Sequence, residues 1–265
     1  MAWINLDGAV NVRDLGGLPL AGGGVTATGQ LIRADNLQEL SPGDIKKLVD
    51  EIGVTVVVDL RSSAELTAEG PAPLDAVPEV RHTHHPVLPE LGSATDVVAD
   101  AILARGERDK SRYPLNPQTG HYLGYLDECP DNVVSAVRSI ATAGGAAIVH
   151  CAAGKDRTGV VVAVALGAAG VEPAAIVADY VATGDRVYEI VDRLSRRPIY
   201  TEDIERRTPD EHRPEADTMT AFLAELDARH GGAAGWLIAH GLGDDGLARL
   251  RVKLRGSRAQ PSGSA

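Results

Sequence analysis

The chain is poor in aromatic residues, in cysteine and in long hydrophobic runs, and each shortage restricts the class of protein. Aromatic residues make up 3% of 265, so the core must consist mainly of Ala, Val, Leu and Ile. Two cysteines cannot form a disulfide framework, which favours a reducing compartment. The longest uncharged apolar run, residues 159–171, is shorter than the roughly 20 residues of a membrane helix. With no leader pattern at residues 1–7, we expect a cytoplasmic protein without stable membrane insertion; leaderless secretion stays open.

Positive charge is also scarce. The chain has 26 Lys and Arg against 37 Asp and Glu, a formal charge of −11. Such a field repels nucleic acids and anionic membrane surfaces, so no nucleic-acid partner is expected. A site for an anionic substrate must therefore create its positive potential locally.

Apolar runs alternate with helical patterns, which predicts an α/β fold with a mainly parallel central sheet flanked by helices. Residues 54–58 and 145–149 are continuous apolar runs, typical of buried parallel strands. Ser41 and Ser62 are expected to cap helices, Ser62 in capping-box spacing with Glu65. Further strands are expected near residues 9–13, 30–33 and 80–87, and helices over 41–53, 132–143, 158–169, 173–183, 185–196, 215–230, 233–240 and 244–255.

A loop with reactive side chains joins the expected strand 145–149 to the expected helix 158–169. It reads His150-Cys-Ala-Ala-Gly-Lys-Asp-Arg-Thr158. Ligands of open α/β sheets bind at the carboxyl ends of the strands, and a helix N-terminus supplies unpaired N–H groups there with about half a positive charge. We therefore expect the loop to bind an anion.

Cys151 and Arg157 are separated by five residues, a spacing that suits a loop curled around a tetrahedral anion. Backbone amides and the guanidinium would hold the non-bridging oxygens while sulfur lies beneath phosphorus. A thiol in such surroundings can have a pKa of roughly 3.5–7.5 and act as a nucleophile at neutral pH. This predicts Cys151 as nucleophile and Arg157 as phosphate clamp. The predicted substrate-binding residues of the loop are Ala152, Ala153, Gly154, Lys155 and Thr158.

Two other kinds of site, a nucleotide-binding P-loop at residues 150–158 and a metal site at the histidines near residue 84, are disfavoured. A nucleotide-binding P-loop needs glycine where Val149 stands, and Asp156 replaces the magnesium-binding hydroxyl. A metal site at His82, His84 and His85 lacks a Cys or carboxylate at ligand spacing. Neither a metal nor another cofactor is expected.

The loop at residues 150–158, called the signature loop below, resembles the Cys-x5-Arg loop of the protein tyrosine phosphatase superfamily. Its Lys155-Asp156 pair resembles the same loop in a bacterial subgroup, the tyrosine and dual-specificity phosphatases related to mycobacterial phosphatase B. Segments that resemble the same subgroup are Asn11-Val-Arg-Asp14, Leu31-Ile-Arg33, Val58-Asp-Leu-Arg-Ser-Ser63, Val177-Ala-Asp-Tyr180 and Gly235-Trp-Leu-Ile-Ala-His-Gly241. The resemblance implies a phosphatase-type fold and hydrolysis of phosphomonoesters through a cysteinyl-phosphate. It also implies that the substrates are phosphoinositides or proteins that carry phosphotyrosine or phosphoserine/threonine. The resemblance implies that no metal takes part.

The acid that protonates the leaving group is left open between two carboxyl groups. Asp156 is favoured because it lies within the signature loop, where a phosphate dianion should raise its pKa. Its other interpretation is a salt bridge to Lys155, Arg61 or Arg33 that only shapes the loop. Glu90 follows a predicted strand, at the place where the superfamily keeps its acid loop, and is otherwise a surface glutamate.

The remaining candidates concern loop position and substrate choice. His150, Asp59 and Arg61 are expected to position the loop. Lys155 adds a cation that suits a second phosphate, as on a phosphoinositide, or else pairs with Asp156. The alternative functions are a phosphate-binding module without catalysis and a sulfur-transfer or arsenate-reducing enzyme. Cys151 and Arg157 together argue against the first, because a pure binder does not need the thiol.

One domain is expected over residues 1–256, followed by a flexible tail at 257–265. The stretch between the strand ending near Val87 and the helix at 132 is longer than a usual connection. We expect residues 93–128 to form a helical insertion that can cover the pocket, because lids commonly gate active sites.

Overall fold

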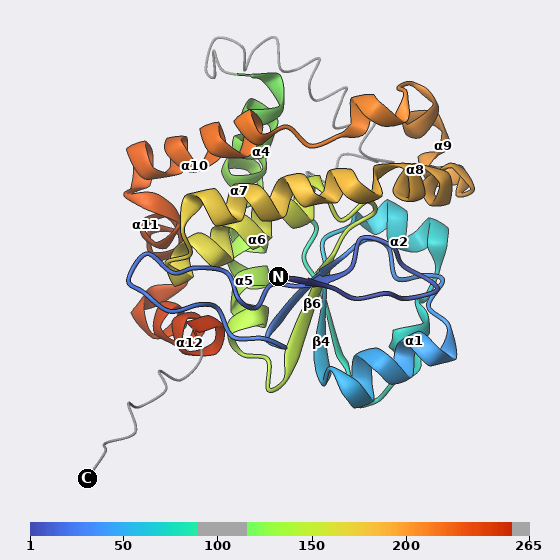
Figure 1. The fold of residues 1–265 in the computed structure, drawn as a ribbon, viewed down its shortest axis with the longest axis horizontal. Coiled ribbons are helices and arrows are strands. Elements are labelled where there is room, and N and C mark those ends of the chain that lie inside the picture. The colour runs from blue at the N-terminus through green and yellow to red at the C-terminus, as the bar shows by residue number, and fades with distance from the viewer. Residues whose placement is uncertain (89–115, 256–265) are drawn as a thin grey trace.

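A six-stranded sheet forms the centre of the computed structural model, which describes residues 1–88 and 116–255 (Figure 1). Its strands follow the order β1-β2-β3-β6-β4-β5. Strands β3, β6, β4 and β5 run parallel, while β1 and β2 add an antiparallel edge. The expected α/β fold with a mainly parallel sheet is confirmed. The strands are β1 (Ala2–Trp3), β2 (Arg13–Asp14), β3 (Leu31–Ala34), β4 (Val54–Asp59), β5 (Arg81–His84) and β6 (Ala146–His150).

Helices cover both faces of this sheet. Val57 and Ile148 point to a smaller layer formed by α1 (Pro42–Lys46), the π-helical turn η1 (Lys47–Glu51) and the 3-10 turn η2 (Pro73–Ala76). Val58 and Val149 point to the larger layer, as the two-residue period of a strand requires. The helices of the larger layer are α4 (Pro117–Glu128), α5 (Pro130–Ala141), α6 (Asp156–Ala169), α7 (Pro173–Ala182), α10 (Ala216–His230), α11 (Gly232–Ala239) and α12 (Gly243–Arg255).

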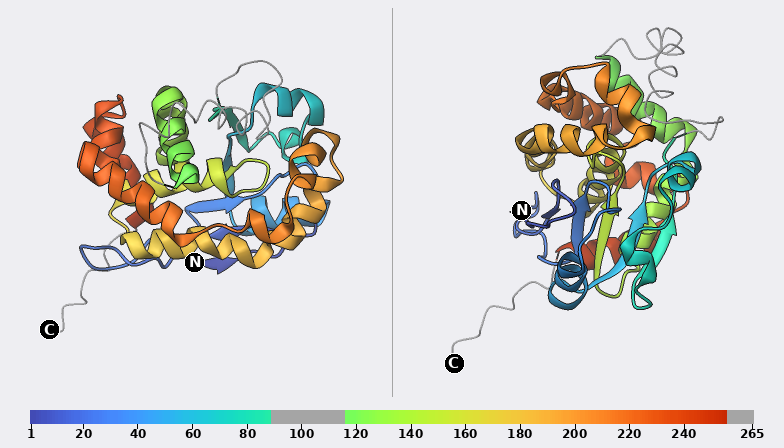
Figure 2. Two further views of the ribbon diagram at one scale, coloured as in Figure 1. Left: turned by 90° about the horizontal axis from the view of Figure 1, so that it is seen from above. Right: turned by 90° about the vertical axis from the view of Figure 1, so that its right-hand side faces the viewer.

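The remaining helices lie near the carboxyl ends of the parallel strands (Figure 2). They are α2 (Ser63–Glu69), η3 (Thr183–Arg186), α8 (Val187–Ser195), α9 (Pro198–Glu205) and η4 (Pro209–His212). Within the described ranges 1–88 and 116–255, no helix is long and apolar enough to span a bilayer.

Helix α6 lies at the centre of the larger layer and is buried along almost its whole length. It is apolar on all sides, as a helix surrounded by other helices must be. Its glycines allow close approach: an added Cβ at Gly159 would lie 3.2 Å from the Tyr180 ring, and one at Gly167 would lie 3.2 Å from Cβ of Ala233. Small residues thus compensate for the scarcity of aromatic side chains.

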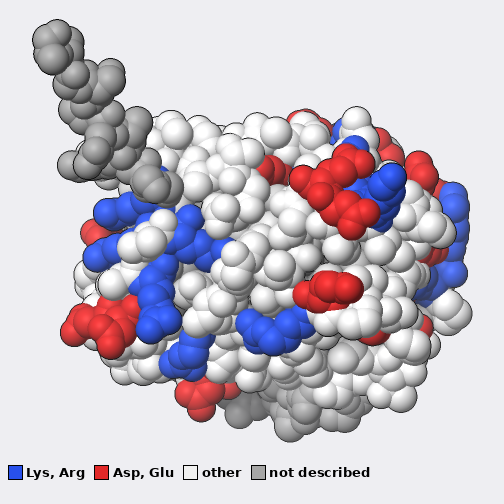
Figure 3. Space-filling view, turned by 90° about the horizontal axis from the view of Figure 1, so that it is seen from below, with Lys and Arg blue, Asp and Glu red and all other residues white. Residues whose placement is uncertain are grey.

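Basic residues of α12 bind the C-terminal ends of two helices on the underside of the molecule. Figure 3 shows Lys and Arg gathered on part of that face. Arg251 and Arg255 donate to the carbonyl groups of residues 168 and 169, at the end of α6. Lys253 donates to the carbonyl groups of residues 143 and 145, just beyond α5. Cations at a helix C-terminus offset the negative end of the helix dipole.

Helix α2 begins as the sequence predicts. The Ser62 hydroxyl accepts the amide of Glu65, and the Glu65 carboxylate accepts the amide of Ser62, which completes a capping box. Ser41 begins α1 in the same way with Asp44. Both predicted caps are confirmed. A cap can be predicted from sequence because it depends only on residues that are close along the chain.

Several expected boundaries are wrong. Strand β5 covers residues 81–84 rather than 80–87, and most of the expected strand 9–13 is irregular. Helix α9 was not expected, because its stretch carries no clear apolar stripe. Helix α4 lies within the expected helical insertion and is fixed by burial of Tyr122, Leu123 and Leu126. Of the predicted insertion, residues 117–128 are α4, whereas 93–115 and the tail lie outside the described residues. The lid therefore stays a prediction.

Candidate active site

The signature loop lies where the sequence analysis expects it, between the end of β6 and the start of α6. Cys151 follows β6 directly and is 2% exposed, while Arg157 and Thr158 are fully buried in the first turn of α6. The thiol and the guanidinium therefore meet at the carboxyl edge of the sheet, next to a helix N-terminus.

The carbonyl groups of residues 152–154 are each bound from outside the loop. The backbone N–H of Asn36 donates to the carbonyl group of residue 152 at 2.9 Å. Nδ2 of Asn11 donates to that of residue 153 at 2.9 Å, and Nη2 of Arg33 donates to that of residue 154 at 2.6 Å. Because the N–H of a trans peptide points away from its C=O, these bonds direct the amides of residues 153–155 into the loop. Successive inward amides form an anion-binding concavity.

A buried ion network holds the donors in place. The Asp179 carboxylate binds Nε of Arg13 at 2.7 Å and Nη1 of Arg33 at 2.5 Å, and Nη1 of Arg13 donates to the Asn11 side chain. Burial alone would raise the pKa of Asp179, but the two arginines outweigh it and lower that pKa. Burial and the neighbouring Arg33 lower the pKa of Arg13 to about 10. Segments 11–14, 31–33 and 177–180 thus meet around the back of the loop.

Gly154 is the one loop position where the backbone requires glycine. Its φ is +66°, and an added Cβ would lie 2.4 Å from the carbonyl oxygen of Ala34. A side chain would therefore both strain the left-handed backbone and push the loop away from β3.

The Arg157 guanidinium is held by Glu65 of α2. Nη1 lies 2.6 Å from Oε2 and Nη2 lies 3.0 Å from Oε1, a bidentate pair between two fully buried side chains. Burial alone would raise the pKa of Glu65, but Arg157 outweighs it and lowers that pKa. In the sequence, Glu65 is recognisable only as a capping residue, because its contact with Arg157 forms only in the tertiary structure.

Asp156 lies at the pocket side of the loop and is bound by helix α4. Its Oδ1 accepts the Tyr122 hydroxyl at 2.5 Å and Nε2 of Gln118 at 3.2 Å, and its Oδ2 lies 3.6 Å from Nζ of Lys155. Burial alone would raise the pKa of Asp156, yet Lys155 and Tyr122 outweigh it and lower that pKa. A bound substrate dianion is expected to raise the pKa of Asp156, which is opposite to the effect of Lys155 and Tyr122.

The salt-bridge partners expected for Asp156 are only partly correct. Lys155 is near it, but Arg33 pairs with Asp179, and Arg61 pairs with Asp59 and Glu69. The other acid candidate, Glu90, lies outside the described residues.

His150, Asp59 and Arg61 lie together behind Cys151. The Asp59 carboxylate is 2.6 Å from Nη2 of Arg61 and 3.5 Å from Nε2 of His150. His150 is buried, which lowers its pKa, and its Nδ1 lies 3.3 Å from the Cys151 carbonyl oxygen. Burial would raise the pKa of Asp59, but His150 and Arg61 outweigh it. The positioning role of the three residues stays a prediction.

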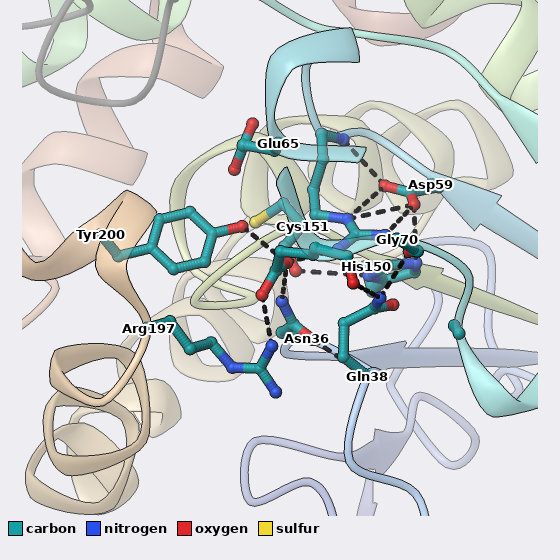
Figure 4. Close-up of polar contacts among 12 residues, drawn as sticks. Asn36, Gln38, Asp59, Glu65, Gly70, His150, Cys151, Arg197 and Tyr200 are labelled. Atoms are coloured by element: carbon teal, nitrogen blue, oxygen red, sulfur yellow. Dashed lines mark hydrogen bonds and ion pairs between the residues drawn. The ribbon is translucent and has the colours of Figure 1, made fainter. Parts of the chain in front are cut away.

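Another buried carboxylate, Glu69, joins α2 to α9 beside the loop. Figure 4 shows its partners Asn36, Arg197 and Tyr200. The Glu69 side chain is 4% exposed and accepts Nδ2 of Asn36 at 2.5 Å, Nη1 of Arg61 at 2.6 Å and the Tyr200 hydroxyl at 3.0 Å; it also pairs with Arg197. The backbone N–H of Asn36 also donates to the loop. The contacts of Glu69 therefore link the wall of the pocket to the loop.

The signature loop forms the floor of a pocket. Helices α8 and α9 provide an apolar wall, and α4 provides a more polar one. Lys155 lies at the rim, where its Nζ donates to the carbonyl group of His212 at 2.9 Å. The residues around the pocket are Gln118, His121, Tyr125, Ala152, Ala153, Lys155, Asp156, Thr183, Val187, Ile190, Val191, Leu194, Tyr200, Ile204, Arg207 and His212.

The three histidines near β5 have separate partners. His82 lies 2.8 Å from the Asp75 carboxylate, Nε2 of His84 lies 2.8 Å from the Arg61 carbonyl oxygen, and His85 contacts the Ser139 hydroxyl. In the part of the chain that the structure describes, no group of three or more His, Cys, Asp or Glu is arranged to hold a metal ion.

Comparison with known proteins shows the family of this chain. A model of the tyrosine phosphatase family matches residues 4–256. The chain belongs to this family. It is 30% identical over 292 aligned positions to the triple specificity protein phosphatase PtpB of Mycobacterium tuberculosis, covering 97% of this chain and 100% of that protein. It is also 31% identical to a putative tyrosine-protein phosphatase of Cupriavidus necator, over 66% of this chain and 61% of that one.

The protein is thus a protein tyrosine phosphatase, and phosphorylated molecules are its substrates. A tyrosine-protein phosphatase of Nostoc commune is 33% identical over 42% of this chain and 39% of its own length. The Cys151 thiol and the Arg157 guanidinium lie within one loop of this phosphatase, and their catalytic roles stay predictions.

Replacing Gly154 with alanine should damage the phosphate site. The left-handed backbone alone costs roughly 1–2 kcal/mol for a residue with a Cβ, and the close contact with Ala34 adds to it. Because a displaced loop no longer presents its amides to the phosphate, we expect about a tenfold loss of kcat/KM for an aryl phosphate, which is about 1.4 kcal/mol of transition-state stabilisation. Gly144→Ala is the control, because a Cβ there meets nothing within 4 Å. Equal activity of the two variants would contradict the prediction.

Replacing Glu65 with glutamine should release Arg157 and destabilise the fold. Removing one partner of a buried pair costs about 3–5 kcal/mol, and turnover should fall with it. Because the pKa of Glu65 is lowered, its contribution is full at neutral pH and is lost as the pH falls through that pKa. Denaturant unfolding should therefore show a difference from wild type that narrows in acid. Exposed Glu51→Gln should show no such difference at any pH.

Proposed function

We propose that this phosphatase hydrolyses phosphomonoesters through a cysteinyl-phosphate, with Cys151 as nucleophile and Arg157 as clamp. The Cys151 thiolate attacks phosphorus, and the bond from phosphorus to the leaving oxygen breaks. Water then attacks the cysteinyl-phosphate, which releases inorganic phosphate and restores the thiolate. The observation that carries this proposal is the outward binding of the loop carbonyl groups, which turns three amides toward the phosphate position above Cys151.

Asp156 is our candidate for the acid that protonates the leaving group. An alkoxide or phenoxide leaves poorly, so a carboxylic acid near the leaving oxygen accelerates the first step. The neighbouring carboxylates Glu65, Asp59 and Glu69 are each bound to arginine. Asp156 instead faces the pocket, with a side chain that is 22% exposed.

Lys155 is our candidate for recognition of a second phosphate. We infer that the substrates include phosphotyrosine and extend to phosphoserine/threonine and phosphoinositides. In support, the M. tuberculosis relative is a triple specificity protein phosphatase. Lys155 lies at the pocket rim with Arg207. Its ammonium group binds the His212 carbonyl group, a contact that an incoming phosphate could replace.

The domain limits and the lid also remain proposals. A single phosphatase domain over residues 1–256 agrees with the extent of the family match. Helix α4 ends the predicted insertion 93–128 and already lines the pocket through Gln118, His121 and Tyr125, which is where a lid would be attached.

Replacing Cys151 with serine tests the mechanism. We expect turnover of a generic aryl phosphate to fall by several orders of magnitude while vanadate still binds, because the loop donors are unchanged. Wild-type turnover should be blocked by vanadate and unaffected by a metal chelator. If the wild type binds vanadate without hydrolysing any phosphomonoester, the protein is a phosphate-binding module instead. Normal turnover by Cys151→Ser would refute the covalent step.

Replacing Lys155 with alanine tests the substrate range. A hydrogen bond to a charged group contributes about 1.5–3 kcal/mol, so kcat/KM for a phosphoinositide with two phosphates should fall at least about tenfold more than for a phosphotyrosine peptide. Exposed Lys46→Ala on α1 is the control. Equal losses for both substrates would show that Lys155 only shapes the loop.

A further inference from the structure

Both hydrogen bonds from α4 to the signature loop end on one atom, Oδ1 of Asp156. The Tyr122 hydroxyl lies 2.5 Å from it and Nε2 of Gln118 lies 3.2 Å from it. The other oxygen, Oδ2, faces Nζ of Lys155 at 3.6 Å. The two oxygens of this carboxyl group therefore have different surroundings.

The donor roles follow from the chemistry of the groups. An ionised carboxylate only accepts, so Tyr122 must donate its single hydroxyl proton to Asp156. The Tyr180 hydroxyl lies 2.7 Å from that of Tyr122 and must then be the donor of this second bond. Burial and the nearby Asp156 raise the pKa of Tyr122 well above its usual value, so the phenol keeps its proton.

We propose that Tyr122 and Gln118 are positioning residues for the acid: they occupy Oδ1 of Asp156, so that the proton given to the leaving group is carried on Oδ2. A proton on Oδ1 would find an acceptor only if Tyr122 turned its own hydroxyl proton toward Tyr180, and it would still face the donor Nε2 of Gln118. When Oδ2 gives up its proton, the same two donors stabilise the carboxylate that forms. This inference rests on the proposed acid role of Asp156.

The arrangement also sets the pH range of the acid. The charged and titratable groups that face Asp156 are Lys155 and Arg157 from the loop and α6, His121 and Tyr122 from α4, Tyr180 from α7 and His212 from η4. The Tyr122 hydrogen bond is one of the contacts that lower the pKa of Asp156 against the effect of burial. Removing it should raise that pKa and extend the protonated form to higher pH.

A purely structural role is the competing interpretation. Tyr122 is fully buried and packs edge-on against Phe222 and Tyr180, so it could serve only to hold α4 against the core. The structural role depends on the aromatic ring of Tyr122, whereas positioning of Asp156 depends on the Tyr122 hydroxyl group. Tyr122→Phe separates the two.

The experiment compares kcat against pH for two aryl phosphates, one with a good and one with a poor leaving group. For Tyr122→Phe we expect kcat with the poor leaving group to fall about tenfold, a much smaller loss with the good one, and little change in KM. The basic limb of the profile should move up by about one pH unit. Tyr188→Phe is the control, because its exposed hydroxyl binds Asp210 outside the pocket.

Gln118→Leu serves as the second variant if Tyr122→Phe does not fold, and should show a smaller loss in the same direction. Asp156→Asn separates the two levels of the argument. If Asp156→Asn loses the same rate with both leaving groups, Asp156 is not the acid and the proposed function needs another donor. If Asp156→Asn shows the leaving-group effect but Tyr122→Phe and Gln118→Leu keep the wild-type profile, the positioning role is overturned and the acid role stands.

Discussion

The attachment of the signature-loop carbonyl groups to donors outside the loop is the interaction on which the active site depends. A peptide carbonyl left facing inward would repel a phosphate, so each must find a partner behind the loop. One of those partners is the guanidinium of Arg33, and a buried guanidinium needs a carboxylate of its own. Asp179 supplies it and binds Arg13 as well, so three distant segments are fixed by the demands of one loop.

The same requirement bears on how an acidic protein can maintain the proposed phosphate site. Its buried arginines near the loop are paired: Arg157 with Glu65, Arg61 with Asp59 and Glu69. Such pairs add little net stability, because desolvation offsets the attraction, but a broken pair is costly. Their effect is to fix geometry. In the proposed site, the positive potential would come from the inward amides, the start of α6 and Lys155.

Helix α6 connects this site to the core. Its N-terminal turn carries Asp156 and Arg157, its sides are buried among α5, α7, α11 and α12, and its C-terminal end is bound by Arg251 and Arg255. A helix held on all sides cannot tilt without disturbing the packing of the larger layer. Small residues such as Gly159 make this close packing compatible with very few aromatic side chains.

The sequence by itself determined the features that depend on neighbouring residues: the buried strands β4 and β6, the cap at Ser62 and the spacing of Cys151 and Arg157. Periodicity, capping and loop length are local properties, so they can be read along the chain. Only the tertiary structure decided which carboxylates serve the loop. Glu65 lies 92 residues from Arg157 and Asp179 lies 146 from Arg33, and Tyr122 reaches Asp156 from a helix without a clear pattern. Contacts over such separations arise from packing of whole elements, which no local pattern records.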